Sequence, residues 1–93
     1  MNTPFFRVRI VGNGEKHNRF LITVPISVDR RAVVRNRVRR AVREHVRTWK
    51  EGGMDIVYIA LPPAGKAEQK ELSAALDGVY TAIRQLHSQK PQH

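Results

Sequence analysis

Residues 32–47 read AVVRNRVRRAVREHVR, and this stretch decides the fold. Neither proline nor glycine interrupts it, and valines recur at positions 34, 38, 42 and 46, which predicts an amphipathic helix. At about 100° per residue, one apolar stripe collects Val34, Val38, Ala41, Val42, His45 and Trp49. The opposite side collects Asn36, Arg39, Arg40, Arg43, Arg47 and Lys50. We therefore expect a helix with one face for a core and one cationic face.

The cationic face is denser in arginine than an ordinary solvated surface. Six arginines lie within residues 32–47, Arg31 lies just ahead, and Glu44 is the one acidic residue among them. Like charges four residues apart destabilise an isolated helix by roughly a few tenths of a kcal/mol per pair. Solvated faces usually mix signs, so the pattern favours a polyanionic partner. Asn36 adds directional hydrogen bonding to a base edge or a ribose hydroxyl.

Composition supports the same partner class. The 93 residues include 17 Lys and Arg against 8 Asp and Glu, a net charge of +9, which predicts RNA, DNA or an anionic membrane surface as partner. The absence of cysteine excludes disulfides, cysteine nucleophiles and cysteine-based zinc sites. No apolar run approaches the ~20 residues of a membrane span, and no secretory signal is recognisable. We expect one cytoplasmic domain over residues 1–88, with a disordered tail at 89–93 and no membrane attachment.

Alternating hydrophobicity predicts two strands before the helix. Residues 5–11 place Phe6, Val8 and Ile10 on one side. Residues 20–26 form the second strand, and Pro25 indicates an edge position or a strand end. The short loop between the strands predicts an antiparallel hairpin. The outer face of the sheet would carry Arg7, Arg9 and Thr23.

The rest of the chain completes a β-β-α-β-α order. Ser27 or Asp29 can cap the central helix, and Gly52-Gly53 ends it. Residues 55–61 are continuously apolar, as an interior strand is. Residues 66–87 predict a second long helix with a core stripe of Leu72, Leu76, Val79, Ile83 and Leu86. The prediction is an α+β fold, a small mainly antiparallel sheet with two long helices on one face.

Catalytic constellations are not recognisable. The histidines at 17, 45, 87 and 93 are scattered without metal-ligand spacing, and no two carboxylates are paired. We expect no catalytic and no metal-binding residue, no small-molecule cofactor, a satisfied His45, and Trp49 in the core. Phe5 and Phe6 fit either the core or stacking on unpaired bases.

The central helix also resembles a known family. Its pattern A-V-x-R-N-R-x-[KR]-R-x-x-R-E is similar to the RNR signature of the bacterial ribonuclease P protein subunit, here Ala32, Val33, Arg35, Asn36, Arg37, Arg39, Arg40, Arg43 and Glu44. Residues 55–60 with Pro62 resemble the family's DIVVIAR-P strand, although Leu61 replaces its arginine. Pro25-Ile26-Ser27 replaces a serine–lysine–lysine segment. The resemblance is to an N-terminally shortened member without the family's basic first helix.

The resemblance implies a left-handed β-α-β crossover, against the usual handedness. It implies a subunit that binds the catalytic RNA of ribonuclease P, while that RNA, with Mg²⁺, removes the 5′ leader from precursor tRNA. With the flanking arginines, the RNA-binding residues are Arg31, Arg35, Asn36, Arg37, Arg39, Arg40, Arg43 and Arg47. Leader binding, without the first helix, would fall to Phe6, Arg7, Arg9 and Thr23.

Three other functions remain open from the sequence. A general RNA-binding or ribosome-associated structural protein would use the same helix without a role in tRNA processing. A stand-alone nuclease lacks a visible acid–base pair. DNA binding agrees with the charge, but the chain lacks a helix-turn-helix pattern.

Overall fold

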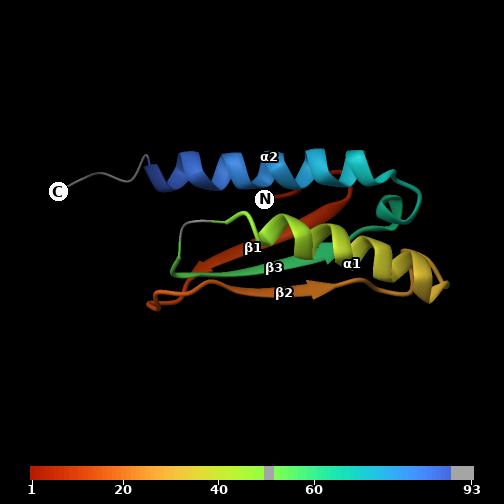
Figure 1. Ribbon diagram of the computed structural model, residues 1–93, viewed down its shortest axis with the longest axis horizontal. Coiled ribbons are helices and arrows are strands. Elements are labelled where there is room, and N and C mark those ends of the chain that lie inside the picture. The colour runs from red at the N-terminus through yellow and green to blue at the C-terminus, as the bar shows by residue number, and fades with distance from the viewer. Residues whose placement is uncertain (50–51, 89–93) are drawn as a thin grey trace.

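The computed structural model describes residues 1–49 and 52–88 (Figure 1). Its elements are β1 (Phe6–Gly12), β2 (Arg19–Thr23), α1 (Ala32–Val46), β3 (Met54–Ala60), the short 3₁₀ helix η1 (Pro62–Gly65) and α2 (Gln69–Ser88). The predicted β-β-α-β-α order and the α+β class are confirmed. The loop expected at 62–65 is the short 3₁₀ helix. The tail predicted at 89–93 lies outside the described residues.

The three strands form one sheet in the order β1-β3-β2. β1 pairs antiparallel with β3, from Phe6 opposite Ala60 to Gly12 opposite Met54. β2 pairs parallel with β3, from Arg19 opposite Asp55 to Thr23 opposite Ile59. The predicted β1–β2 hairpin is therefore wrong. β3 is the most continuously apolar strand, and the central position, with a neighbour on both edges, is the one that buries it best.

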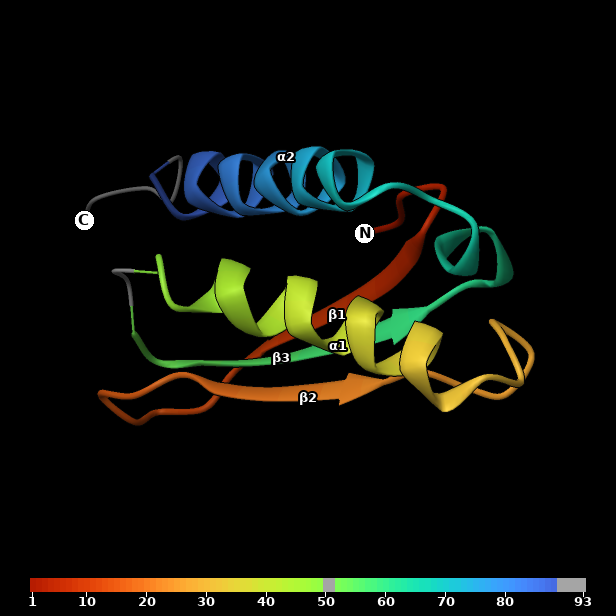
Figure 2. The same cartoon turned by 45° about the vertical axis from the view of Figure 1, so that its right-hand side comes forward.

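Helix α1 is the crossover between the parallel strands β2 and β3. In Figure 1 both strands point right, β2 lies below β3, and α1 passes in front of the sheet, so the crossover is left-handed, as the resemblance implied. Figure 2 shows α2 on the same side of the sheet as α1. Within residues 1–49 and 52–88, no element covers the other sheet face. This arrangement leaves two surfaces open, the outer side of α1 and the outer face of the sheet.

The core lies between the two helices and the inner face of the sheet. Phe6 and Val8 of β1 are buried, and Phe6 packs edge-to-face on Tyr58 of β3 with ring centroids 6.5 Å apart. Both helices contribute their predicted stripes, Val34, Val38, Ala41, Val42, Leu72, Leu76, Val79 and Ile83. The side chain of Leu86, predicted to extend the second stripe, lies outside the described residues. None of the described helices is long and apolar enough to span a bilayer.

Element boundaries differ from the predictions by a few residues. β2 ends at Thr23, two residues before Pro25, at the edge of the sheet as predicted. α1 begins after Arg31, and neither predicted residue caps it; instead the Asp29 carboxylate accepts the backbone N–H of Arg31 at 2.8 Å. α1 ends at Val46, well before Gly53, whose φ of +88° serves the turn into β3.

Candidate nucleic-acid interface

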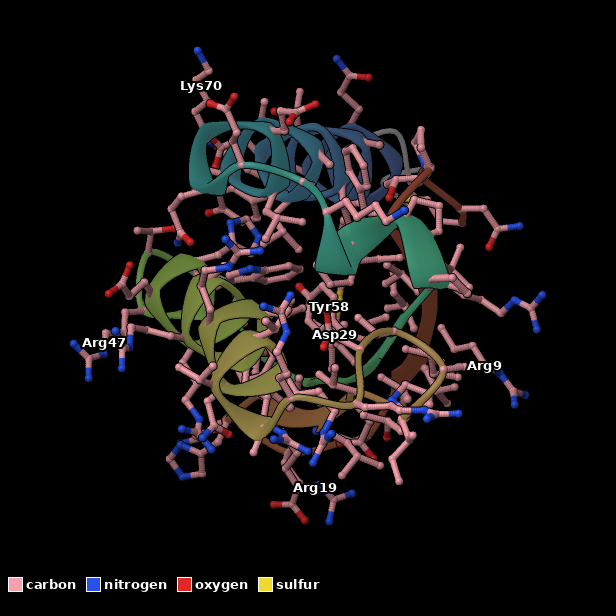
Figure 3. All side chains as sticks on the ribbon, turned by 90° about the vertical axis from the view of Figure 1, so that its right-hand side faces the viewer. Arg9, Arg19, Asp29, Arg47, Tyr58 and Lys70 are labelled. Atoms are coloured by element: carbon pink, nitrogen blue, oxygen red, sulfur yellow. The ribbon has the colours of Figure 1, made fainter. Side chains whose placement is uncertain are left out.

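The outward side of α1 forms the cationic face, defined as Arg31, Arg35, Asn36, Arg37, Arg39, Arg40, Arg43 and Arg47. All these residues are exposed or half-buried, whereas the apolar stripe of the same helix is buried. Figure 3 shows the Arg47 side chain projecting away from the protein on the α1 side. Burial of the stripe against the sheet and α2 therefore fixes the direction in which the cationic side chains point. The structure places six of the eight predicted residues on α1 and the other two, Arg31 and Arg47, at its N-cap and C-cap.

Two arginines at the start of the cationic face are engaged with the chain itself. Arg31 forms an ion pair with Asp29, with 3.1 Å between Nη2 and Oδ2. Hydrogen bonds from Arg31 hold the pKa of the Asp29 carboxyl below its ordinary value. Arg35 Nη1 donates to the backbone carbonyls of Asp29 and Arg30 at 3.0 and 2.8 Å. These contacts fix the turn that precedes α1.

The centre of the cationic face is internally braced. Arg37 Nη2 donates to the carbonyl of Gly65 in η1 at 3.1 Å, a contact between groups 28 residues apart in the chain. Arg39 Nη1 donates to Asn36 Oδ1 at 3.0 Å. That bond uses the amide oxygen of Asn36 as an acceptor. The two N–H donors on the amide nitrogen therefore stay available for a ligand. The sequence predicts that these residues contact RNA, but it gives no sign of the hydrogen bonds to Gly65 and between Arg39 and Asn36.

Three arginines of the face are held by no such contact. Within the described part of the chain, Arg40, Arg43 and Arg47 form no ion pair, and their side chains are exposed. Each guanidinium offers five N–H donors in a planar fork that suits phosphate oxygens. This half of α1 is therefore the strongest candidate for phosphate contacts.

The outer face of the sheet is the second candidate surface. Arg7 and Arg9 of β1 and Thr23 of β2 are exposed there, as predicted. The register sets Arg7 and Thr23 on either side of Ile59, while Leu21 lies beside Val57. An apolar centre thus lies beside a cationic edge, and Figure 3 shows Arg9 pointing away on the side opposite Arg47.

Phe6 does not belong to this surface. Its side chain is 0% exposed and packs against Tyr58 in the core. The alternation along β1 turns Phe6 inward and Arg7 outward, so the prediction of Phe6 as a leader-binding residue is corrected. Two apolar side chains that sequence analysis did not single out, Leu21 at 59% and Val11 at 61% exposure, lie exposed on the outer side of the strands instead.

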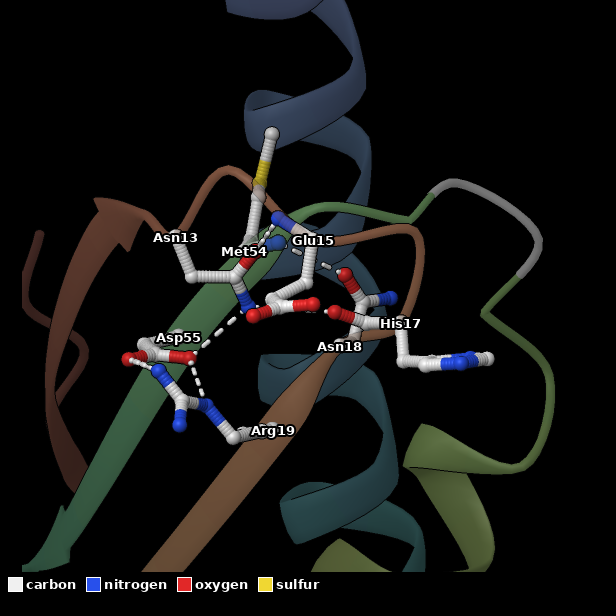
Figure 4. A network of polar contacts seen from close by, with 7 residues as sticks. All are labelled: Asn13, Glu15, His17, Asn18, Arg19, Met54 and Asp55. Atoms are coloured by element: carbon white, nitrogen blue, oxygen red, sulfur yellow. Dashed lines mark hydrogen bonds and ion pairs between the residues drawn. The ribbon is translucent and has the colours of Figure 1, made fainter.

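A polar network pins the β1–β2 loop to the start of β3 (Figure 4). Arg19 binds the Asp55 carboxylate through two hydrogen bonds of 2.7 and 2.8 Å, and Asn13 Nδ2 donates to the same carboxylate at 2.9 Å. Asn18 Oδ1 accepts the backbone N–H of Met54 at 3.0 Å. The hydrogen bonds from Arg19 and Asn13 lower the pKa of Asp55. Sequence spacing gave no sign of this network, because it joins residues 13–19 to residues 54–55, which are more than 30 residues further along the chain.

His45 and Trp49 complete the core at the end of α1. Trp49 Nε1 donates to His45 Nε2 at 3.2 Å, and His45 Nδ1 lies 3.5 Å from an Asp77 carboxylate oxygen. Burial lowers the pKa of His45, so the neutral imidazole accepts the tryptophan N–H. The predicted satisfied histidine and core tryptophan are confirmed.

Metal ligands do not converge on either surface. Among the residues that the structure describes, no three His, Asp or Glu side chains are grouped so as to hold a metal ion. The carboxylates of Asp29 and Asp55 are each paired with arginine. Within residues 1–49 and 52–88, the side chains therefore do not form the group of oxygen ligands that a magnesium site needs.

Comparisons with known proteins agree on one family. The family model described as Ribonuclease P matches residues 1–84. The ribonuclease P protein component of Coxiella burnetii (strain Dugway 5J108-111) is 34% identical over 88 residues, which cover 83% of this chain and 73% of that protein. Its counterpart in Synechocystis sp. (strain ATCC 27184 / PCC 6803 / Kazusa) is 39% identical over 59 residues, covering 59% and 48%.

Solved structures show the same likeness. The Staphylococcus aureus RNase P protein superposes with a TM-score of 0.79 at 26% identity, covering 89% of this chain and 78% of that one. The RNase P protein from Thermotoga maritima superposes with a TM-score of 0.74 at 26% identity, covering 85% and 77%.

Proposed function

This chain belongs to the ribonuclease P family, as the protein component of that ribonucleoprotein endoribonuclease, and on this premise we propose that the cationic face of α1 binds the catalytic RNA. The observation that carries the proposal is the exposed surface formed by Arg40, Arg43 and Arg47, which make no ion pair with any residue that the structure describes. Phosphate contacts of this kind release counterions from the RNA, so the affinity falls steeply with salt.

We assign the substrate to the other surface. Precursor tRNA would lie with its 5′ leader across the outer face of the sheet, where Arg7 and Arg9 contact phosphates and Thr23 offers a hydroxyl. Unpaired leader bases could pack on the apolar centre formed by Leu21, Val57 and Ile59. In this arrangement Mg²⁺ is held by the RNA, which carries out the cleavage. The assembly would act in the cytoplasm.

The test is cleavage of precursor tRNA by the cognate catalytic RNA at low Mg²⁺, with and without the protein. Wild type should stimulate cleavage. A variant with Arg40, Arg43 and Arg47 changed to Gln should lose most of that stimulation, because it loses three phosphate contacts. The matched control changes Lys16, Lys66 and Lys70 to Gln, which removes the same charge away from α1. An equal loss of stimulation in the two variants would show that net charge, and not the cationic face, is responsible.

General RNA binding is the alternative that family membership does not favour. It predicts equal affinity for any structured RNA of similar length and no stimulation of cleavage. Competition of the cognate RNA against an unrelated structured RNA, at one fixed salt concentration, separates the two functions.

A further inference from the structure

A hollow on α1 lies within the cationic face and is not explained by charge alone. Its volume is about 410 Å³, and it is lined by Val33, Val34, Asn36, Arg37 and Arg40. That volume falls in the ~300–1,000 Å³ range of small-ligand sites. The hollow therefore has room for a ligand larger than one phosphate group.

Val33 is the unusual member of this lining. Its side chain is 72% exposed, although it stands among arginines that favour a hydrated surface. An exposed valine contributes nothing to phosphate binding, but it gains free energy when a flat apolar surface covers it. The neighbouring Val34 is buried and continues the apolar wall inward.

Two of the three polar members of the lining, Arg37 and Asn36, are held in position by residues outside the hollow. The carbonyl of Gly65 accepts a hydrogen bond from Arg37, and Arg39 donates to Asn36 Oδ1. Arg37 therefore keeps further N–H donors, and the Asn36 amide keeps both of its own. Donors fixed in this way lose little entropy when a ligand binds.

The lining combines an apolar wall, an amide and two cations. A nucleotide presents the matching groups, a flat base with hydrogen-bond acceptors on its edge and a charged phosphate. Because bases within a helix are stacked and paired, only an unpaired nucleotide can enter. A carboxylate ligand would use the arginines but not the valines, and a lipid chain would leave the amide and both arginines without partners.

We propose that this hollow receives one unpaired nucleotide of the catalytic RNA, with its base on Val33, its edge at the Asn36 amide and its phosphate at Arg40. The inference rests on the proposed function, and it adds a base-recognising site to a surface otherwise assigned to phosphates. It also gives the exposed valine a role in recognising a base. Because this contact is apolar, its contribution to affinity does not depend on salt.

The test replaces Val33 with Ser, which removes the apolar wall while the exposed position leaves folding intact. Binding to the cognate catalytic RNA is measured at several salt concentrations, and 2′-hydroxyl acylation reports which unpaired nucleotides become ordered. Val33→Ser should weaken binding about five- to tenfold with an unchanged salt dependence. One unpaired nucleotide, protected by wild type, should regain reactivity.

Three variants serve as comparisons. Val33→Ile keeps the wall and should bind like wild type. Val11→Ser changes a similarly exposed valine on β1, outside the cationic face, and should leave the affinity for the catalytic RNA unchanged. Arg43→Ala lies outside the lining and should lower the slope of log K against log[salt] by about 0.7–0.9 without exposing a single nucleotide.

Two results would overturn the proposal. The first is a Val33→Ser protein that binds and protects the RNA like wild type. The second is a loss of affinity in which no nucleotide regains reactivity. If wild type neither binds this RNA nor stimulates cleavage, the proposed function fails together with the hollow. If wild type does both and Val33→Ser matches it, only the hollow fails.

Discussion

Gly65 and Gly78 are both glycines next to or within helices, but their surroundings differ. A Cβ on Gly65 would overlap the backbone carbonyl of Val28, whereas a Cβ on Gly78 would meet no atom within 4 Å. Gly65 ends η1, offers its carbonyl to Arg37 and closely approaches the backbone of Val28. The absence of a side chain is therefore needed at one of the two positions only.

We predict opposite effects of alanine at these positions. Gly65→Ala should lower the free energy of unfolding by roughly 1–3 kcal/mol, because backbone must move to accept the methyl group. Gly78→Ala should raise it by about 0.5–1 kcal/mol, because alanine favours a helix interior. Urea unfolding of both variants measures the two changes. A neutral Gly65→Ala would show that the Val28 segment yields easily.

His45 predicts a pH dependence of stability. Its side chain is 7% exposed and its pKa is lowered by burial, so below the ordinary value of about 6.5 the unfolded chain binds more protons than the folded one. The free energy of unfolding should therefore fall as the pH drops from 7.5 to 5.5. His45→Gln should flatten this dependence, and His17→Gln, at an exposed position, should keep it. Urea unfolding at both pH values is the measurement, and an unchanged slope in His45→Gln would contradict the assignment.

Among elements, α1 and η1 are joined by a hydrogen bond from one side chain of the cationic face. Arg37 spends one N–H donor on Gly65, while Arg40, one turn further along α1, is free of such a contact among the described residues. Two arginines of one signature therefore differ in what they do. One positions the surface in addition to any contact with RNA, and the other is available to RNA alone.

We predict that these two arginines can be separated by stability. Arg37→Gln should lower the free energy of unfolding by about 1 kcal/mol through loss of a partly buried hydrogen bond. Arg40→Gln should change it by less than about 0.5 kcal/mol. Each variant removes one charge, so the salt dependence of RNA binding should fall similarly in both. Urea unfolding and salt titrations of RNA affinity check the two parts, and equal stabilities would count against the bond to Gly65.

At the scale of the whole molecule, the two open surfaces lie on different sides. The left-handed crossover sets α1 on the inner face of the sheet, with its cationic face outward, and leaves the outer sheet face bare. Figure 3 shows Arg47 and Arg9 pointing to opposite sides. One small domain therefore presents two surfaces on different sides, as the proposed binding of the catalytic RNA and of the substrate requires.

We predict that this separation appears in the kinetics. Replacing Arg7 and Arg9 by Gln should raise the KM for a precursor tRNA with a long leader several-fold, because each exposed arginine supplies a phosphate contact. The KM for a substrate with a one-nucleotide leader, and the affinity for the catalytic RNA, should stay unchanged. Steady-state cleavage of the two substrates is the measurement. An equal effect on both leaders would remove the sheet face from leader binding.

Local patterns in the sequence were enough to predict the elements, and the net charge predicted a polyanionic partner. Periodicity depends on neighbours within a few residues, so the faces of α1, β1 and α2 could be predicted from local spacing. The family signature and the net charge, read the same way, led to ribonuclease P.

The order of the strands and the contacts between elements became known from the three-dimensional structure. The strand order, the Arg37–Gly65 bond and the Asp55 network all join residues far apart in the chain, where spacing carries no information. The hairpin prediction failed for this reason: a short loop allows two strands to pair, but in this sheet β3 lies between β1 and β2 and pairs with both. Long-range packing, which no local pattern encodes, therefore sets the strand order and joins α1 to η1 through the Arg37–Gly65 bond.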